Sequence, residues 1–242
     1  MMIGQISKGK IGSYLKMAFV FVSLSVINVN TLSSQGLYLG GKGGGQAISS
    51  YIEHSIFNLS MRTTIIPGGH GGFFMKYLPE QRDNVIINSG VQLGVNYVQK
   101  GWGQEFLSAQ PDYQMRLNYL EIPLEGILYV GNRSKYFITL GCFVEFLMDT
   151  ESDPIPDLGN LGGSDFYTYE QGRDREIGYG FRASGGFFQD FSFGQVHLEG
   201  FFSYSVSNFI NPGDLTTETP DISNLWVVGG AIGYLIPFKS RK

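Results

Sequence analysis

Charged residues stand at alternating positions inside otherwise apolar segments of this sequence. They are Glu121, Glu125, Glu145, Arg182 and Glu199, with Lys42 as a further candidate. Such groups can form ion pairs, line a narrow ion path or transfer protons. Glu121 and Glu125 are four residues apart, roughly 13 Å at a strand rise of ~3.3 Å, which is too far for a catalytic carboxylate pair. We interpret the set as a buried charge cluster that plugs an interior, and a narrow ion path or gate is the alternative.

Other residue patterns do not indicate catalysis, metal binding or a cofactor. His54, His70 and His197 lack a short metal-ligand spacing, and Cys142 is the single cysteine. The glycine-rich stretch 40–45 lacks the spacing of a phosphate-binding loop. The sequence also has no Gly-x-Ser-x-Gly motif. We therefore expect a protein that is not an enzyme and has no cofactor and no metal site.

The charged positions fall in segments where apolar residues alternate with polar or small ones. The longest is 85–100, with Val91, Leu93, Val95 and Tyr97 on one parity and mostly polar or glycine residues on the other. Successive side chains of a strand point to opposite faces of a sheet, so the pattern predicts strands with one apolar and one polar face. Seven further segments of this kind are 36–47, 69–78, 120–130, 136–148, 177–187, 196–206 and 226–238.

The connections between these eight segments predict how the strands are arranged. Long connections (48–68, 102–115, 150–174, 207–224) alternate with short ones (79–84, 131–135, 189–194), as in bacterial outer-membrane barrels. Lipid offers no hydrogen bond to a backbone group, so a spanning sheet must close on itself. Charged residues are only 16% of the chain, against roughly 25% in soluble domains. We predict an all-β fold, an eight-stranded antiparallel up-and-down transmembrane β-barrel.

Aromatic residues gather near the predicted strand ends. They include Trp102, Tyr129, Tyr136, Tyr179 and Tyr234. Tyr and Trp are enriched where a membrane meets water, so we expect these side chains to form belts on the outer surface.

The first 34 residues have the pattern of an export signal. Lys8, Lys10 and Lys16 precede an apolar run from Met17 to Ile27, which is too short to span a bilayer. We predict a cleaved signal peptide at 1–34, a barrel domain at 35–242, and location in the cell outer membrane. Cleavage removes three Lys from 17 basic residues and none of the 21 acidic ones, leaving a net charge of −7. That charge argues against a nucleic-acid partner.

Three stretches resemble the porin-like outer-membrane β-barrel domain family, which includes PorT-like proteins. They are the opening glycine-rich stretch 40–44, the stretch LNYLEIPL at 117–124 and the terminal GYLIPF at 233–238. The resemblance extends from about residue 36 to residue 238, and it implies an exported, eight-stranded barrel in the outer membrane. It brings no catalytic residues with it. The chain departs from the pattern by ending in Lys239-Ser240-Arg241-Lys242 rather than at an aromatic residue.

The long connection 150–174 holds the best candidate for contact with a partner. It combines acidic and aromatic groups in Asp165, Phe166, Tyr167 and Tyr169, and loops often carry function on such scaffolds. We expect outer-membrane lipid and proteins bound through the long outer loops as partners. The functional prediction is an integral outer-membrane protein with a structural, interaction or small-porin role. The alternatives are an accessory subunit of a secretion or surface-motility machine, and a soluble ligand-binding β-barrel.

Overall fold

A computed structural model describes residues 36–54, 59–79, 86–104, 113–153, 172, 174–211 and 220–238. Residues 36–238 form one compact unit. The predicted signal peptide at 1–34 and the candidate contact residues Asp165, Phe166, Tyr167 and Tyr169 lie outside the described residues. In the described ranges, no helix is long and apolar enough to cross a membrane.

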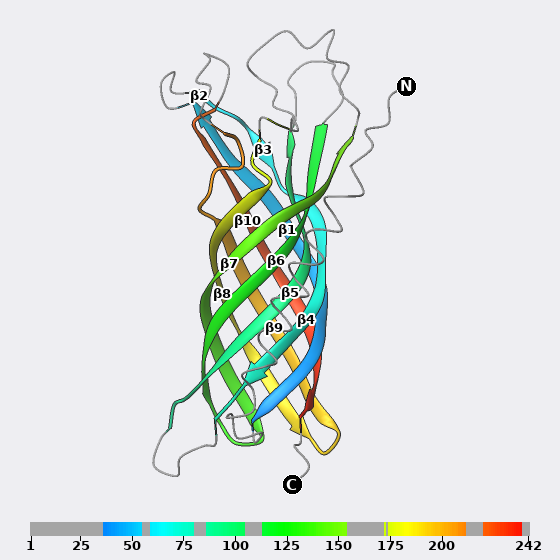
Figure 1. Cartoon of the computed structure of the whole chain (residues 1–242), viewed down its shortest axis with the longest axis vertical. Coiled ribbons are helices and arrows are strands. Elements are labelled where there is room, and N and C mark those ends of the chain that lie inside the picture. Colours follow the sequence, from blue (N-terminus) through cyan, green and yellow to red (C-terminus); the bar gives the residue numbers. More distant parts are fainter. Residues whose placement is uncertain are drawn as a thin grey trace. The chain divides into compact units, whose positions relative to one another are not determined.

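The described strands belong to a single antiparallel sheet, in which eight are long and two are two-residue pieces (Figure 1). Their bounds are β1 Leu37–His54, β2 Leu59–Ser60, β3 Thr63–Thr64, β4 Ile66–Tyr77, β5 Asn88–Gln104, β6 Tyr113–Val130, β7 Ser134–Asp153, β8 Ile177–Phe191, β9 Gly194–Ser205 and β10 Ile222–Pro237. The short pieces β2 and β3 fall inside the predicted long connection 48–68.

The sheet closes on itself because its first strand pairs with its last. The long strands follow one another around the sheet in chain order, and β1 pairs with both β4 and β10. The β1–β10 register runs from Tyr38↔Pro237 to Glu53↔Ile222. No long strand is left with a free edge, as a membrane-spanning sheet requires. The predicted eight-stranded up-and-down barrel is confirmed.

Several strands are longer than the alternating segments from which they were predicted. β1 continues to His54, although the alternation ends near Ala47. Its last residues include Ser49, Ser50 and Glu53, so the apolar parity is lost while the pairing with β10 continues. Hydrophobic periodicity therefore marks the part of a strand that faces lipid, and it misses the part that extends beyond.

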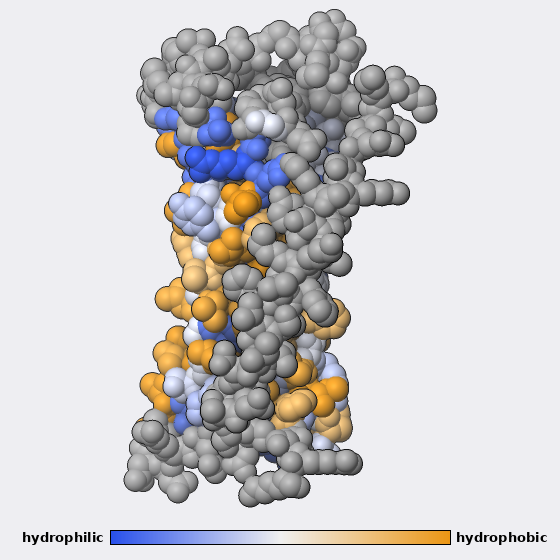
Figure 2. All heavy atoms as spheres, viewed as in Figure 1, coloured by the Kyte–Doolittle hydropathy of each residue, from blue (hydrophilic) through white to orange (hydrophobic). Residues whose placement is uncertain are grey.

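The outer wall carries an apolar band with a polar zone beyond one edge. Outward residues in the band include Phe73, 78% exposed, and Leu140, 69% exposed. On β7 the outward positions change to Asp149, Glu151 and Asp153 near the end of the strand. Figure 2 shows apolar side chains along the visible wall and hydrophilic ones above them. An exposed apolar surface of this extent is suited to hydrocarbon rather than to water.

The expected aromatic belts are correct for some residues and wrong for others. Tyr136, Tyr179 and Tyr234 are exposed on the outer wall. Trp102 is 0% exposed and Tyr129 is also buried, because both side chains point into the barrel. The parity of their strands predicts this, since Trp102 is two residues from the inward Lys100 and therefore lies on the same face.

Candidate functional site: the barrel interior

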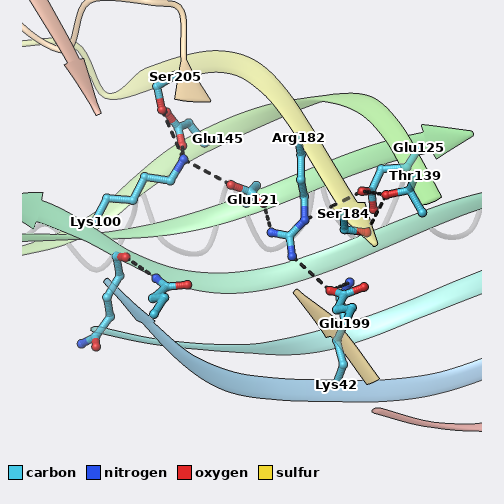
Figure 3. A network of polar contacts seen from close by, with 12 residues as sticks. Lys42, Lys100, Glu121, Glu125, Thr139, Glu145, Arg182, Ser184, Glu199 and Ser205 are labelled. Carbon is cyan, nitrogen blue, oxygen red and sulfur yellow. Dashed lines mark hydrogen bonds and ion pairs between the residues drawn. The ribbon is translucent and has the colours of Figure 1, made fainter. Parts of the chain in front are cut away.

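The barrel interior contains every residue of the predicted charge cluster. Glu121 and Glu125 come from β6, Glu145 from β7, Arg182 from β8 and Glu199 from β9 (Figure 3). All five are at most 3% exposed. Lys42 from β1 joins them and is also buried. Each residue stands on the inward parity of its strand, so closing the sheet brings together side chains that are far apart in the sequence.

Arg182 lies at the centre of the cluster and faces three carboxylates. Its guanidinium nitrogens are 3.2 Å from Glu199 Oε1, 3.6 Å from Glu121 Oε1 and 3.8 Å from Glu125 Oε1. The guanidinium carbon also lies 3.7 Å from the ring centre of Phe201. A planar guanidinium can meet several carboxylates and stack on a ring at once, so lysine would not replace Arg182 here.

Two lysines complete the pairing of these carboxylates. Lys42 Nζ lies 2.6 Å from Glu199 Oε1, the same oxygen that faces Arg182. Lys100 Nζ lies 2.5 Å from Glu145 Oε2 and 3.2 Å from Glu121 Oε2. Glu121 therefore lies between Lys100 and Arg182 and connects the two halves of the cluster.

Neutral side chains donate hydrogen bonds to two of these carboxylates, Glu125 and Glu145. Thr139 donates a hydrogen bond to Glu125 Oε1 at 2.9 Å, and Gln92 donates to Glu125 Oε2 at 2.6 Å. Ser205 donates to Glu145 Oε1 at 2.8 Å. Buried ions need such partners, because each one has lost its hydration.

A second group of polar residues continues the cluster toward the short turns. Lys76 on β4 donates to Gln195 Oε1 at 3.1 Å, and its ammonium lies 2.9 Å from His197 Nδ1. The other ring nitrogen of His197 lies 3.1 Å from Glu199 Oε2. Gln195 in turn donates to Asp190 at 2.7 Å. This chain of contacts links the cluster to one end of the barrel.

Three residues that contact the cluster were not among the predicted ones: Lys76, Lys100 and His197. Lys100 shares its parity with Gln92 and Asn96, so strict alternation along 85–100 could have found it. His197 shares its parity with Glu199 in the same way. Lys76 stands in a strand whose glycines weaken the alternation, and no comparable signal marks it.

The basic and acidic groups of the cluster, with the neighbouring Lys76 included, are equal in number. Three cations, Lys42, Lys100 and Arg182, contact the carboxylates of Glu121, Glu125, Glu145 and Glu199. Lys76, beside them on Gln195 and His197, is a fourth basic group. A balanced set of ions with hydrogen-bonded partners can persist in an interior where a single unpaired charge could not.

Apolar layers lie on either side of the charged layer. At the long-loop end, Ile52, Trp102, Tyr113, Met115, Leu117, Tyr119, Phe209, Ile210 and Leu225 pack together. At the short-turn end, Leu78, Ile127, Tyr129, Phe137 and Phe188 form a second group. Eight strands enclose a space that side chains can fill, and these three layers fill it.

The described interior offers no constellation for metal chemistry. No three His, Cys, Asp or Glu side chains in the described ranges are grouped so that they could hold a metal ion. Cys142 is exposed on the wall of β7 rather than in the interior. The charged groups instead bind one another, which is an arrangement for filling and fixing the barrel.

The family of the chain follows from a comparison with protein-family models. Residues 27–211 match the model of the outer membrane protein beta-barrel domain. The chain belongs to this family. It is therefore an outer-membrane β-barrel protein, as its closed sheet and apolar wall indicate independently. A comparison with curated proteins finds no match.

A comparison with solved structures finds outer-membrane proteins that are similar to this chain. OprG from Pseudomonas aeruginosa is 13% identical, with a TM-score of 0.50 over 84% of this chain and 97% of that one. Neisserial surface protein A is 12% identical, with a TM-score of 0.41 over 84% and 98%. Ail, the attachment invasion locus protein of Yersinia pestis, is 10% identical, with a TM-score of 0.37 over 84% and 100%. The likeness to OprG shows a shared fold, and identities this low show nothing further.

Proposed function

We propose that this outer-membrane barrel is a closed scaffold that presents its long outer loops to other molecules, rather than an open pore. The observation that carries the proposal is the charged layer between two apolar layers. Arg182 alone faces carboxylates from β6 and β9. A water-filled channel would hydrate these groups, whereas here they are at most 7% exposed and face one another.

The proposal assigns the interior charges a structural role and no catalytic one. Charged groups that pair across the barrel fix which strands face each other, and they resist sliding of one strand past the next. The family also sets aside the soluble ligand-binding barrel that the sequence allowed. An accessory role in a secretion or surface-motility machine fits a loop-presenting scaffold, and loss of surface-protein export on gene deletion would support it.

Recording from planar lipid bilayers tests the closed state directly. Purified wild-type protein should give no discrete conductance steps. The double variant Arg182→Ala/Glu121→Ala, recorded once it shows heat-modifiable gel mobility, removes the centre of the charged layer and should also stay silent, because the apolar layers on either side still fill the barrel. Ile138→Ala, on the outer wall of β7, is the matched control and should stay silent. Regular conductance steps from the wild type would reject the closed scaffold in favour of a small porin.

A further inference from the structure

The outer wall has a hollow where β10, β1 and β4 lie side by side. It is shallow and wide open to the outside, with a volume of about 470 Å³. Its lining residues are Gly45, Gln46, Ala47, Ile65, Ile66, Pro67, Val228 and Gly229. The side chains that border it on the outward parity are apolar, and Ile65 is exposed beside it. The hollow therefore opens on the face that meets lipid.

The hollow exists because an outward position is glycine where a side chain would fit. A Cβ added to Gly45 would have no heavy atom within 4 Å. The neighbouring Gly44 faces inward, and a Cβ there would come within 1.9 Å of Gly230 O. Close packing therefore requires glycine at position 44. It does not require glycine at position 45, where a larger residue would add apolar contact.

The hollow borders a break in the hydrogen-bond ladder of the wall. β4 pairs with β5 only as far as His70↔Val98, and β3 resumes at Thr64↔Gly103. Amide side chains bridge part of the break, since Gln46 Nε2 donates to the carbonyl oxygen of Gln99 at 2.5 Å. Gln46 is 7% exposed and stands on the inward parity of β1, like Lys42, so its side chain bridges the break from inside the barrel.

A cation stands at the outer margin of the hollow. Arg116 on β6 reaches across β5 and donates from its terminal nitrogen to the carbonyl oxygen of Pro67 at 3.1 Å. It passes beside Gly101, its cross-strand neighbour, which has no side chain to block it. The other terminal nitrogen lies 3.4 Å from Gln114 Oε1. Glu151, the neighbour of Arg116 on β7, accepts instead from Asn118 at 3.3 Å.

The level of Arg116 matches that of a lipid headgroup. Its partner on β7 is Glu151, in the zone where the outward residues of that strand have become acidic. The hollow lies on the apolar side of this boundary, because Val228 and Gly45 belong to the band of exposed apolar and small residues. A lipid with an anionic group at this boundary and a hydrocarbon chain below it would fit both Arg116 and the apolar hollow.

We propose that this site binds one anionic membrane lipid, with its phosphate on Arg116 and one acyl chain in the hollow beside Gly45. A guanidinium with donors to spare is well suited to a phosphate. The apolar hollow then holds one acyl chain of this lipid, in addition to the ordinary contact that the outer wall makes with surrounding lipid.

Tryptophan fluorescence gives a probe that the protein already contains. Of the two Trp residues, Trp102 is buried in the interior and Trp226 lies on β10, two residues from Val228. The protein is reconstituted in phosphatidylcholine vesicles with a minor fraction of phosphatidic acid brominated on its chains. Matched vesicles carry brominated phosphatidylcholine. We expect the anionic lipid to quench Trp226 at roughly tenfold lower fraction, the effect of one charge-assisted contact.

Variants at Arg116 and at Gly45 test the binding of the headgroup and of the acyl chain separately. Arg116→Gln should abolish the preference for phosphatidic acid, and Arg116→Lys should retain part of it. Arg175→Gln, at an exposed arginine remote from the lining residues, is the control and should keep the preference. Gly45→Leu should fill the hollow and reduce quenching, whereas Gly126→Leu, at an outward glycine of β6 with similar room and outside the lining, should not.

Each result is read only for variants with wild-type heat-modifiable gel mobility, so misfolding is not mistaken for lost binding. Equal quenching by the two brominated lipids would overturn the proposal, because the hollow would then have ordinary lipid contact only. Loss of the preference in Arg116→Gln but not in Gly45→Leu would also overturn it, since the phosphate would bind without the chain in the hollow. If Arg116→Lys retains part of the preference and Gly45→Leu loses it, the proposal stands.

Discussion

The charged layer and the apolar layer at the long-loop end fill the same barrel by opposite means. In the charged layer, Arg182, Glu121 and Glu199 depend on one another, so removing one leaves ions without partners. In the apolar layer, residues such as Leu117 and Leu225 contribute by contact, and removing one leaves a cavity. The charged layer should therefore be more sensitive to a single change and should respond non-additively, because its interactions are shared.

The largest effect should come from Arg182→Ala. The change leaves Glu121, Glu125 and Glu199 facing a space that their common cation had filled. We expect a loss of about 3–5 kcal/mol in the free energy of unfolding, the usual result of stranding a buried charge. Urea unfolding in lipid vesicles measures it. Wild-type stability would show that the carboxylates have other partners, and the comparison between the layers would fail.

Leu117→Ala should have a somewhat smaller effect. Leu117 is fully buried in the apolar layer, and its truncation removes contacts without stranding a charge. We expect a loss of about 2–4 kcal/mol from lost burial and the cavity left behind. The same urea titration gives the value. A loss clearly greater than that for Arg182→Ala would reverse the order proposed for the two layers.

A glycine comparison tests how tightly the charged layer is packed. A Cβ at Gly141 would lie 2.1 Å from Leu124 O and 2.8 Å from Glu125 Cγ, whereas one at Gly200 on the outer wall would meet only Gly229 O at 3.9 Å. Gly141→Ala should cost about 1–3 kcal/mol through overpacking. Gly200→Ala should be neutral or slightly stabilising, by about 0.5 kcal/mol, because alanine restricts the unfolded chain. Similar stability of the two variants would mean that the charged layer can accommodate an added methyl group.

The coupling between Lys42 and Glu199 should be similar in size to the cost of Gly141→Ala. A double-mutant cycle with Lys42→Met and Glu199→Gln should give an interaction energy of about 1–3 kcal/mol, because the two groups are 2.6 Å apart. The matched cycle of Leu117→Ala with Phe201→Ala joins residues of separate clusters and should be additive within about 0.5 kcal/mol. Additivity in the Lys42–Glu199 cycle would show that these ions act independently.

Alternation in the sequence predicts the barrel and most of its interior, because the period of a strand is two. Glu121 and Arg182 stand on the inward parity of segments with clear apolar partners, so their location follows once the sheet closes. Trp102 obeys the same parity and was misplaced because tryptophan was read by residue type instead. In this barrel the position of a residue in the alternation predicts whether its side chain faces inward better than its residue type does.

What the sequence could not provide is the register between strands. The pairing of Arg182 with both Glu121 and Glu199 depends on how far each strand is offset from its neighbours. The alternation of apolar and polar residues does not predict that offset. The break between β4 and β5 is hidden for the same reason, since Pro67 and Gln99 meet only in the closed barrel. The extended ends of the strands, such as Ser49 to His54, lack alternation altogether.

Cysteine accessibility tests the closed interior most directly. In a Cys142→Ala background, Ser203→Cys places a thiol opposite Arg182 at a position that is 1% exposed, and Asp153→Cys places one on the exposed end of β7. A small charged methanethiosulfonate reagent is added to the folded protein in vesicles. The cysteine at 203 should stay unmodified until the barrel is unfolded, while the cysteine at 153 reacts at once. Equal labelling rates at both positions in the folded protein would mean that water fills the lumen, and the closed scaffold would be wrong.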